Sequence, residues 1–175
     1  MQAAIDNVRA PGGGRIGLTA CPGIATAFGR DNRRGALDAD LAAIVGWRAR
    51  ALITLVEPFE LTLLGVEGLG ERADAQGLAW WHLPVIDGTA PGSAFEPRWS
   101  EAGPALHRHL DADERIVLHC HAGMGRSGAV AARLLVERGM PPEEAVITVR
   151  RARPGAIENN EQVRWVLGCP AGNPR

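Results

Sequence analysis

Apolar residues along the chain fall into short uninterrupted runs and longer runs with helical spacing. The short runs, bounded by turn residues, predict strands over residues 15–20, 51–56, 78–85 and 115–119. The longer runs predict helices over residues 38–48, 96–110, 128–138, 141–151 and 158–167, and a partly helical segment over 59–76. Strands that alternate with helices predict an α/β domain with helices on both faces of a sheet.

The chain length fits a single domain. With 175 residues, the chain can bury one core but is too short for two ordinary domains. The turn-forming run PGGG predicts an irregular N-terminal tail over residues 1–14. We expect the folded domain to cover residues 15–168 and a short C-terminal tail to cover residues 169–175.

The charge balance does not indicate a polyanionic partner. Basic and acidic residues leave a net charge of −1, so we expect neither nucleic acid nor an anionic membrane as a partner. All 19 basic residues are arginine, which excludes mechanisms that need a P-loop lysine or a lysine Schiff base. The composition does not indicate an oligomeric state.

The lack of a recognisable targeting signal and the pattern of cysteines favour the cytoplasm. The N-terminus lacks a basic segment followed by an apolar run, and no apolar stretch reaches the roughly 18–20 residues that span a bilayer. Cys21, Cys120 and Cys169 are odd in number and widely spaced, which does not fit a disulfide framework. We therefore expect a reducing, cytoplasmic location, where a reactive thiol survives.

Residues 119–128, with the sequence HCHAGMGRSG, carry the most specific chemical signal. A predicted strand delivers Cys120 to a glycine-rich turn, and a helix begins near Ser127. The backbone N–H groups of such a turn and the positive end of the helix dipole form a cradle for a phosphate dianion. Arg126 adds a planar contact to two phosphate oxygens. The same positive field favours the thiolate form of Cys120, which is the nucleophilic form, and Ser127 can donate to its sulfur.

Three other interpretations of this segment are weaker. Cys120 alone would fit a buried core thiol, but the neighbouring glycines and Arg126 at this spacing argue against it. Residues 123–128 match the dinucleotide-binding pattern GxGxxG, yet that pattern needs a further parallel strand and an acidic residue, whereas a helix follows here. The run His119-Cys120-His121 would suit a metal, but adjacent strand residues point to opposite faces and the sequence shows no second pair of ligands, so we expect no metal site.

The segment from His119-Cys120 to Arg126-Ser127 resembles the signature loop of protein tyrosine and dual-specificity phosphatases. The resemblance extends over about residues 15–167. Three further pieces are similar to the subfamily of dual-specificity phosphatases that associate with cyclin-dependent kinases: Phe28 with Arg33-Arg34, residues 83–88 (LPVIDG) and residues 150–157 (RRARPGAI). The resemblance implies a central four- or five-stranded, mostly parallel sheet, no metal or other cofactor, and a phosphocysteine intermediate.

The resemblance also implies roles for individual residues. It assigns Cys120, Arg126, Ser127 and Asp87 to catalysis. It assigns phosphate binding to the loop residues His121, Ala122, Gly123, Met124, Gly125 and Arg126. Asp87 would protonate the leaving oxygen and then accept a proton from the hydrolytic water. From the sequence alone, Asp87 before Gly88 fits a turn-stabilising role equally well.

The chain departs from the family pattern in two places. Many tyrosine phosphatases have Ile-Gln-Thr where this chain has Ile157-Glu158-Asn159, and that glutamine positions the hydrolytic water. Glu158 and Gln162 are the candidates for positioning this water, and Asn159 is a further substitute. The role favoured for Glu158 is to stabilise the start of a helix. The signature loop also lacks the lysine typical of inositol-lipid phosphatases, which disfavours a highly phosphorylated substrate.

Several residues around the loop are weaker candidates. Glu57 and Glu60 follow a predicted strand and are placed to brace Arg126, and Arg153 is placed to face the pocket rim. We expect His119 to play a structural role behind the loop. Either Cys21 or Cys169 would form a disulfide with oxidised Cys120 if close enough.

The predicted function is cysteine-dependent hydrolysis of phosphate monoesters of the protein tyrosine or dual-specificity type. The expected partner is a phosphorylated protein or a small phosphate ester. Three alternatives remain open: a module that binds phosphorylated ligands without turning them over, a phosphatase of small molecules, and sulfur or arsenate chemistry on a similar loop.

Overall fold

The computed structural model describes residues 4–24 and 30–172. The sequence piece at Phe28 lies outside the described residues, as do the side chains of Arg33 and Arg34. The strands are β1 (Asp6–Arg9), β2 (Arg15–Thr19), β3 (Ala49–Thr54), β4 (Ala79–His82) and β5 (Arg115–His119). The helices are α1 (Arg30–Gly46), α2 (Pro58–Leu64), α3 (Leu69–Ala75), α4 (Phe95–Asp111), α5 (Gly125–Glu137), α6 (Pro142–Ala152) and α7 (Asn160–Leu167).

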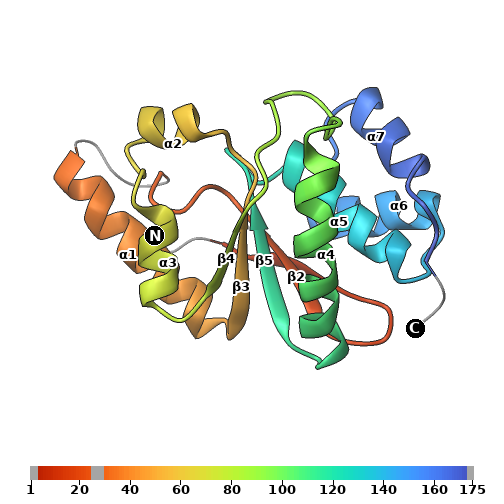
Figure 1. Ribbon diagram of the computed structural model, residues 1–175, viewed down its shortest axis with the longest axis horizontal. Coiled ribbons are helices and arrows are strands. Elements are labelled where there is room, and N and C mark those ends of the chain that lie inside the picture. Colours follow the sequence, from red (N-terminus) through yellow and green to blue (C-terminus); the bar gives the residue numbers. More distant parts are fainter. Residues whose placement is uncertain (1–3, 25–29, 173–175) are drawn as a thin grey trace.

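The described strands form one five-stranded sheet in the order β1-β2-β5-β3-β4. Strand β5 lies at the centre and pairs in parallel with β2 and β3, and β4 pairs in parallel with β3. Only β1, among these strands, runs antiparallel to its neighbour. The mostly parallel sheet expected from the family resemblance is therefore confirmed (Figure 1).

Strand β1 corrects the expectation that residues 1–14 are an irregular tail. Residues Asp6–Arg9 pair with Arg15–Leu18 along the edge of the sheet. Glycines 12–14 all adopt positive φ values in the tight connection between the two strands. The sequence signal was too weak to show β1, because Val8 is the single apolar residue in the strand DNVR.

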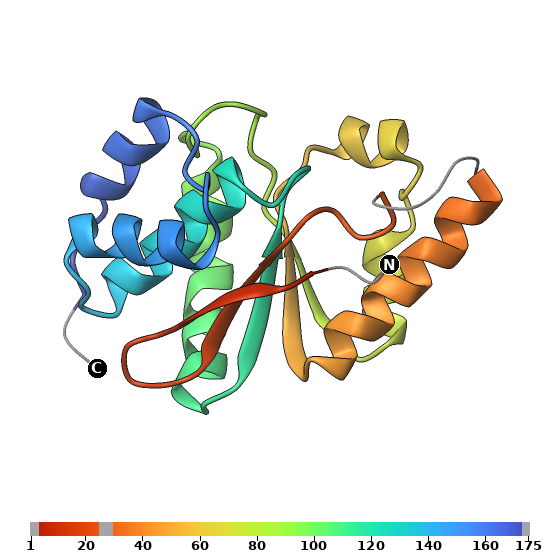
Figure 2. The ribbon, with the colours of Figure 1, turned by 180° about the vertical axis from the view of Figure 1, so that it is seen from behind.

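Helices cover both faces of the sheet, as predicted. Helices α1 and α3 lie on one side, and α4 to α7 lie on the other (Figures 1 and 2). Ile116 and Leu118 of β5 point into the larger core cluster under α4 and α5, while Val117 points into the smaller cluster under α1 and α3. This alternation is the pattern of a strand buried on both faces.

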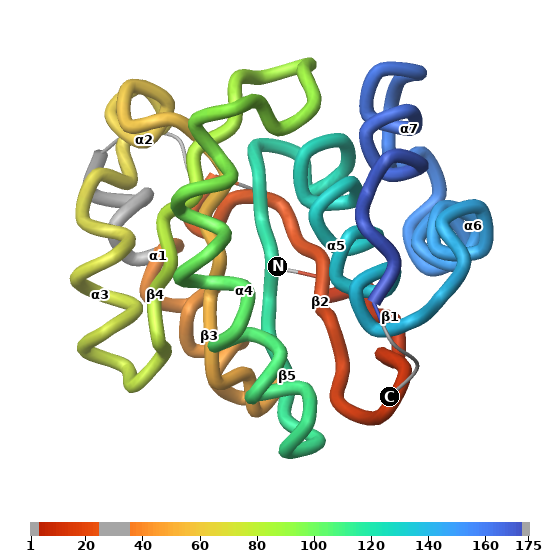
Figure 3. Tube along the Cα trace, turned by 45° about the vertical axis from the view of Figure 1, so that its right-hand side comes forward, coloured from red at the N-terminus to blue at the C-terminus, as the bar shows by residue number. Residues whose placement is uncertain are grey.

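The carboxyl ends of the parallel strands meet at one edge of the sheet, which the tube in Figure 3 shows at the top. His119, the last residue of β5, lies level with Thr19 of β2 and Thr54 of β3. The connections after β2, β3, β4 and β5 therefore converge above this edge, where ligands bind in open parallel sheets. None of the helices in the described part of the chain is long and apolar enough to cross a bilayer.

Candidate active site

Cys120 lies directly after β5, at the convergence of these connections. Its side chain is 3% exposed and belongs to the larger core cluster. The sulfur lies 3.5 Å from Oγ of Ser127, which is itself completely buried in the first turn of α5. The predicted contact between Ser127 and the sulfur is thus present.

The loop between Cys120 and α5 is held by a close approach to β2. Gly123 has φ +72°, and a Cβ atom there would collide with the backbone carbonyl of Thr19. The N–H of Cys21 donates a hydrogen bond of 2.9 Å to the carbonyl of His121. Glycine at position 123 is therefore required both by its backbone conformation and by its contact with β2.

Helix α5 starts at this loop with its N–H groups uncapped by any described side chain. Its N-cap residue is Met124, and its first turn holds no acidic side chain. Such a helix start provides N–H donors and a positive partial charge for an anion. The loop of residues 120–126 therefore leads into an uncapped helix start, as the sequence predicted, while phosphate binding by this loop stays a prediction.

Arg126 is 1% exposed and is oriented by three acceptors that lie far from it in the sequence. Its two terminal nitrogens bind the two carboxylate oxygens of Glu60 at 2.7 and 3.0 Å, and Nη1 also donates to the carbonyl of Val85 at 3.0 Å. Its Nη2 lies 2.9 Å from Oδ1 of Asp87. Its Nε is buried and has no hydrogen-bond partner among the described residues.

The Glu60–Arg126 pair is ionised. Burial alone would raise the pKa of the Glu60 carboxyl, but hydrogen bonds from Arg126 and from the Glu57 N–H hold this pKa below its usual value. The prediction that Glu60 braces Arg126 is confirmed. Glu57 instead precedes α2 as its N-cap residue and donates its N–H to Glu60.

His119 is completely buried behind the loop and holds the carbonyl of Cys120. Burial lowers the pKa of His119 to about 4, so the ring is neutral and carries one N–H. Nδ1 must be that donor because the Cys120 carbonyl, 3.3 Å away, can only accept. Nε2 then accepts from the Thr54 hydroxyl at 2.7 Å, which accepts in turn from Nε1 of Trp80 at 2.8 Å.

Asp87 stands at the corner of a tight turn after β4. The N–H of Thr89 donates to the carbonyl of Ile86, and Gly88 has φ +73°. The Asp87 side chain is 71% exposed, yet its carboxylate reaches Arg126. The turn role is therefore present, and the carboxylate lies beside Arg126. The role of Asp87 as a general acid stays a prediction.

The start of α7 packs against the other side of the loop. A Cβ atom on Gly125 would overlap Glu158 and lie 2.8 Å from Nε2 of Gln162. Gln162 is completely buried, and its amide is bound to the Glu158 N–H and the Thr89 carbonyl. The structure thus brings Gln162 and Glu158 to the loop. The positioning of water by either residue stays a prediction.

Arg153 contacts the loop from behind. Its Nη2 donates to the carbonyl of Ala122 at 2.9 Å, and its Nη1 pairs with Asp6 of β1 at 2.7 Å. The contact with Ala122 fits the expected place near the pocket. The sequence did not indicate that Asp6, Val85 and Thr54 support the site. Each of them acts through a main-chain group or through a partner that is distant in the chain.

The two other cysteines are free thiols in different surroundings. Cys21 is bound through its N–H to the loop, and burial together with the charges of Cys120 and Glu60 raises its pKa to about 12. Cys169 follows α7, and burial raises its pKa to about 11. Cys21 is therefore the cysteine that lies close to Cys120.

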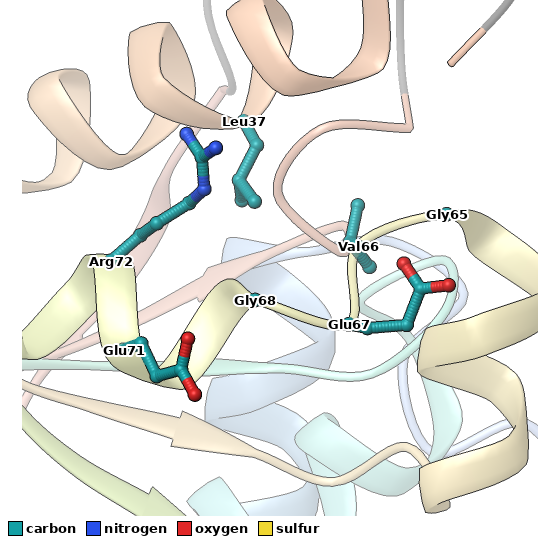
Figure 4. Close-up of a pocket in the computed structure, with 7 residues that line it drawn as sticks. All are labelled: Leu37, Gly65, Val66, Glu67, Gly68, Glu71 and Arg72. Carbon is teal, nitrogen blue, oxygen red and sulfur yellow. The ribbon is translucent and has the colours of Figure 1, made fainter. Parts of the chain in front are cut away.

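A separate cavity of about 500 Å³ opens between α1 and the start of α3. Figure 4 shows the residues that line it: Leu37, Gly65, Val66, Glu67, Gly68, Glu71 and Arg72. Arg72 is paired with Asp38, and the other charged lining residues are glutamates. This cavity includes no residue of the loop between Cys120 and Arg126.

The family model described as "Polymorphic toxin system, DSP-PTPase phosphatase" matches residues 28–140, which include Asp87, Cys120 and Arg126. The chain belongs to this family. This membership in the dual-specificity phosphatases confirms the resemblance inferred from the signature loop.

Curated relatives of the chain include further phosphatases. A probable protein tyrosine phosphatase type IVA A of Dictyostelium discoideum is 33% identical over 96 residues, covering 55% of this chain and 57% of that protein. Cyclin-dependent kinase inhibitor 3 of Sus scrofa is 28% identical over 154 residues, covering 86% of this chain and 69% of that protein. The chain spans little more than half the length of the type IVA relatives that it matches.

Solved structures of dual-specificity and tyrosine phosphatases share the fold. The crystal structure of a kinase associated phosphatase has a TM-score of 0.78 and 24% identity, covering 95% of this chain and 93% of that chain. The crystal structure of Tk-PTP in the active form has a TM-score of 0.65 and 28% identity, covering 89% and 90%. The single α/β domain is therefore the fold of this family.

Proposed function

We propose that the chain hydrolyses phosphate monoesters with Cys120 as the nucleophile. The observation that carries this proposal is the position of the Cys120 sulfur at the uncapped start of α5, beside a buried arginine whose Nε lacks a partner among the described residues. A thiolate there lies in the field of the helix start and of Arg126. Family membership supports the same activity.

In the first step, the Cys120 thiolate attacks phosphorus while the loop N–H groups and Arg126 hold the phosphate oxygens. The phosphorus–oxygen bond to the leaving group breaks as the sulfur–phosphorus bond forms, and Asp87 donates a proton to the departing oxygen. The negative charge that spreads over the phosphate oxygens meets donors that are already oriented. The product of this step is a phosphocysteine and a free alcohol or phenol.

In the second step, a water molecule attacks the phosphocysteine. Asp87, now a carboxylate, accepts a proton from this water, and the sulfur–phosphorus bond breaks to release inorganic phosphate. Ser127, 3.5 Å from the sulfur, donates a hydrogen bond that stabilises the departing thiolate. None of these steps requires a metal or cofactor.

The proposed substrate is a phosphorylated protein or a small phosphate ester. The variable positions of the loop are His121, Ala122 and Met124, so the loop offers no lysine for a second or third phosphate group. The three free thiols fit the reducing cytoplasm, which is the proposed location.

The decisive experiment is a screen of phosphopeptides and phosphorylated metabolites with chelator present, with Cys120→Ser as the blank. We expect the wild-type protein to release phosphate from at least one substrate and the variant to release none. Single-turnover kinetics then separates an enzyme from a binding module. Phosphocysteine that forms and persists supports the binding module, and metal-dependent activity that survives in Cys120→Ser contradicts the proposal.

A further inference from the structure

The turn that carries Asp87 is bound at each of the next three residues by a side chain from the start of α7. Nδ2 of Asn159 donates to the carbonyl of Gly88 at 2.9 Å. Nε2 of Gln162 donates to the carbonyl of Thr89 at 3.2 Å. Oε1 of Glu161 accepts from the N–H of Ala90 at 3.0 Å. Three side chains at the start of α7 therefore bind three consecutive main-chain groups of this turn.

In Asn159 and Gln162, both the oxygen and the nitrogen of the side-chain amide form hydrogen bonds. Oδ1 of Asn159 caps α7 by accepting from the Gln162 N–H at 3.0 Å, while its Nδ2 binds the turn. Oε1 of Gln162 accepts from the Glu158 N–H at 2.8 Å, while its Nε2 binds the turn. Each amide oxygen accepts from a main-chain N–H, either in α7 or at Glu158 just before it. The amide nitrogen on the same side chain therefore points toward the turn.

Gln162 also links this turn to the phosphate-binding loop. It is completely buried, and its amide packs against the Cα atom of Gly125, where a Cβ atom would lie 2.8 Å from Nε2 and 3.0 Å from Oε1. On the opposite side, Val85 and Asp87 contact the guanidinium of Arg126. The turn is thus held between α7 and Arg126, both of which contact the loop that follows Cys120.

We infer that Asn159, Glu161 and Gln162 are positioning residues that hold Asp87 over the phosphate-binding loop before substrate arrives. The inference rests on the proposed function, in which Asp87 protonates the leaving oxygen. It also gives residues 158–162 a role other than the water positioning expected of the family glutamine. With the acid fixed in advance, proton transfer needs no prior movement of the turn.

This role predicts an effect that depends on the leaving group. A good leaving group such as p-nitrophenolate departs with little help from an acid, whereas phenolate or an alkoxide needs protonation. Loosening the turn should therefore slow phenyl phosphate hydrolysis much more than p-nitrophenyl phosphate hydrolysis. A merely structural role would slow both substrates equally.

Two variants loosen the turn, and each removes one hydrogen bond between α7 and the turn. Asn159→Asp keeps the oxygen that caps α7 but removes the nitrogen that donates to Gly88. Glu161→Ala removes the acceptor for Ala90 from an exposed position. Its matched control is Glu143→Ala, because Glu143 is also exposed and is the second residue of its helix, so both changes remove an acidic side chain from a first turn.

We expect kcat for phenyl phosphate to fall about tenfold or more in Asn159→Asp and Glu161→Ala, as a part of the 10²–10⁴-fold that a general acid contributes. The p-nitrophenyl phosphate rate should change less than about threefold, and Glu143→Ala should behave as wild type. In an Asp87→Asn background, the α7 changes should have no further effect on phenyl phosphate, because they act through Asp87.

Equal losses on the two substrates, or an undiminished loss in the Asp87→Asn background, would overturn the inference. Wild-type protein without activity above the Cys120→Ser blank would instead overturn the proposed function. The two failures are therefore distinguishable in the same set of assays.

Discussion

Glu60 and Arg126 lie 66 positions apart in the sequence and form a two-pronged ion pair with both side chains at most 8% exposed. The carboxylate accepts one hydrogen bond from each terminal nitrogen of the guanidinium, and these two bonds fix the plane of the guanidinium. The remaining Nε is then held in one direction. The ion pair thus orients the Arg126 guanidinium but leaves its Nε donor without a partner among the described residues.

Removing Glu60 should destabilise the protein strongly. Glu60→Ala leaves the buried Arg126 charge without its main partner, and breaking such a pair costs about 3–5 kcal/mol. Glu60→Gln keeps one oxygen acceptor and should cost less. Urea denaturation measures both, and equal stability of Glu60→Ala and wild type would show that the pair is not required for the fold.

Gly123→Ala should disrupt the phosphate-binding loop, because the new methyl group meets the Thr19 carbonyl. Gly77 provides a matched control, since it has φ +81° but open space where a Cβ atom would lie. Gly77→Ala should cost only the backbone strain of about 1–2 kcal/mol. Gly123→Ala should also lower kcat/KM by about 10²-fold, because the loop must shift. Similar activity in the two variants would contradict the proposed tight contact.

The buried neutral state of His119 predicts a loss of stability in acid. In the unfolded chain a histidine takes up a proton near pH 6.5, whereas burial lowers the pKa of folded His119 to about 4. Between these values the unfolded state binds more protons, so the free energy of unfolding falls as the pH falls, by on the order of 3 kcal/mol in full. Urea titrations from pH 7 to pH 4 should show a shallower decline for His119→Asn than for wild type.

Asp87→Asn should lower the rate with phenyl phosphate about 10²–10⁴-fold while binding of phosphate is retained. The amide cannot donate the proton that the leaving oxygen needs, but it leaves the loop and the Glu60–Arg126 pair unchanged. Steady-state kinetics with product inhibition by phosphate checks both parts. A variant that turns over phenyl phosphate as fast as wild type would remove Asp87 from the mechanism.

The sequence predicted the parts of the site that are local in the chain. The strand ending at His119, the glycine-rich turn and the following helix are contiguous, so spacing alone indicated the cradle around Cys120. The α/β architecture followed from the alternation of strands and helices, and the family resemblance implied a mostly parallel sheet of four or five strands, of which the structure shows five in the described residues. The expected helical segment at 59–76 was weakened by glycines, and it divides into α2 and α3 after Gly65, which has φ +71°.

The supports of the site are long-range and could not be predicted from spacing. Glu60 was one of two equally placed glutamates, and only the fold shows that the first turn of α2 directs it to Arg126. Thr54 and Trp80 act through a buried histidine, and Asn159 acts through a main-chain carbonyl, so their residue types gave no signal. Strand β1 was missed because a four-residue edge strand with one buried side chain has no measurable periodicity.

Arg153 joins Asp6 in β1 to the Ala122 carbonyl in the loop. Segments near the start and near the end of the described chain therefore support the loop that lies between them in the sequence. The block matched by the family model, 28–140, contains Asp87, Cys120 and Arg126, the residues proposed to react, but neither β1, Arg153 nor α7. A fragment cut to that block would keep Cys120 but lose β1, β2, α6 and α7. We therefore expect the smallest working unit to be larger than the part by which the family is recognised.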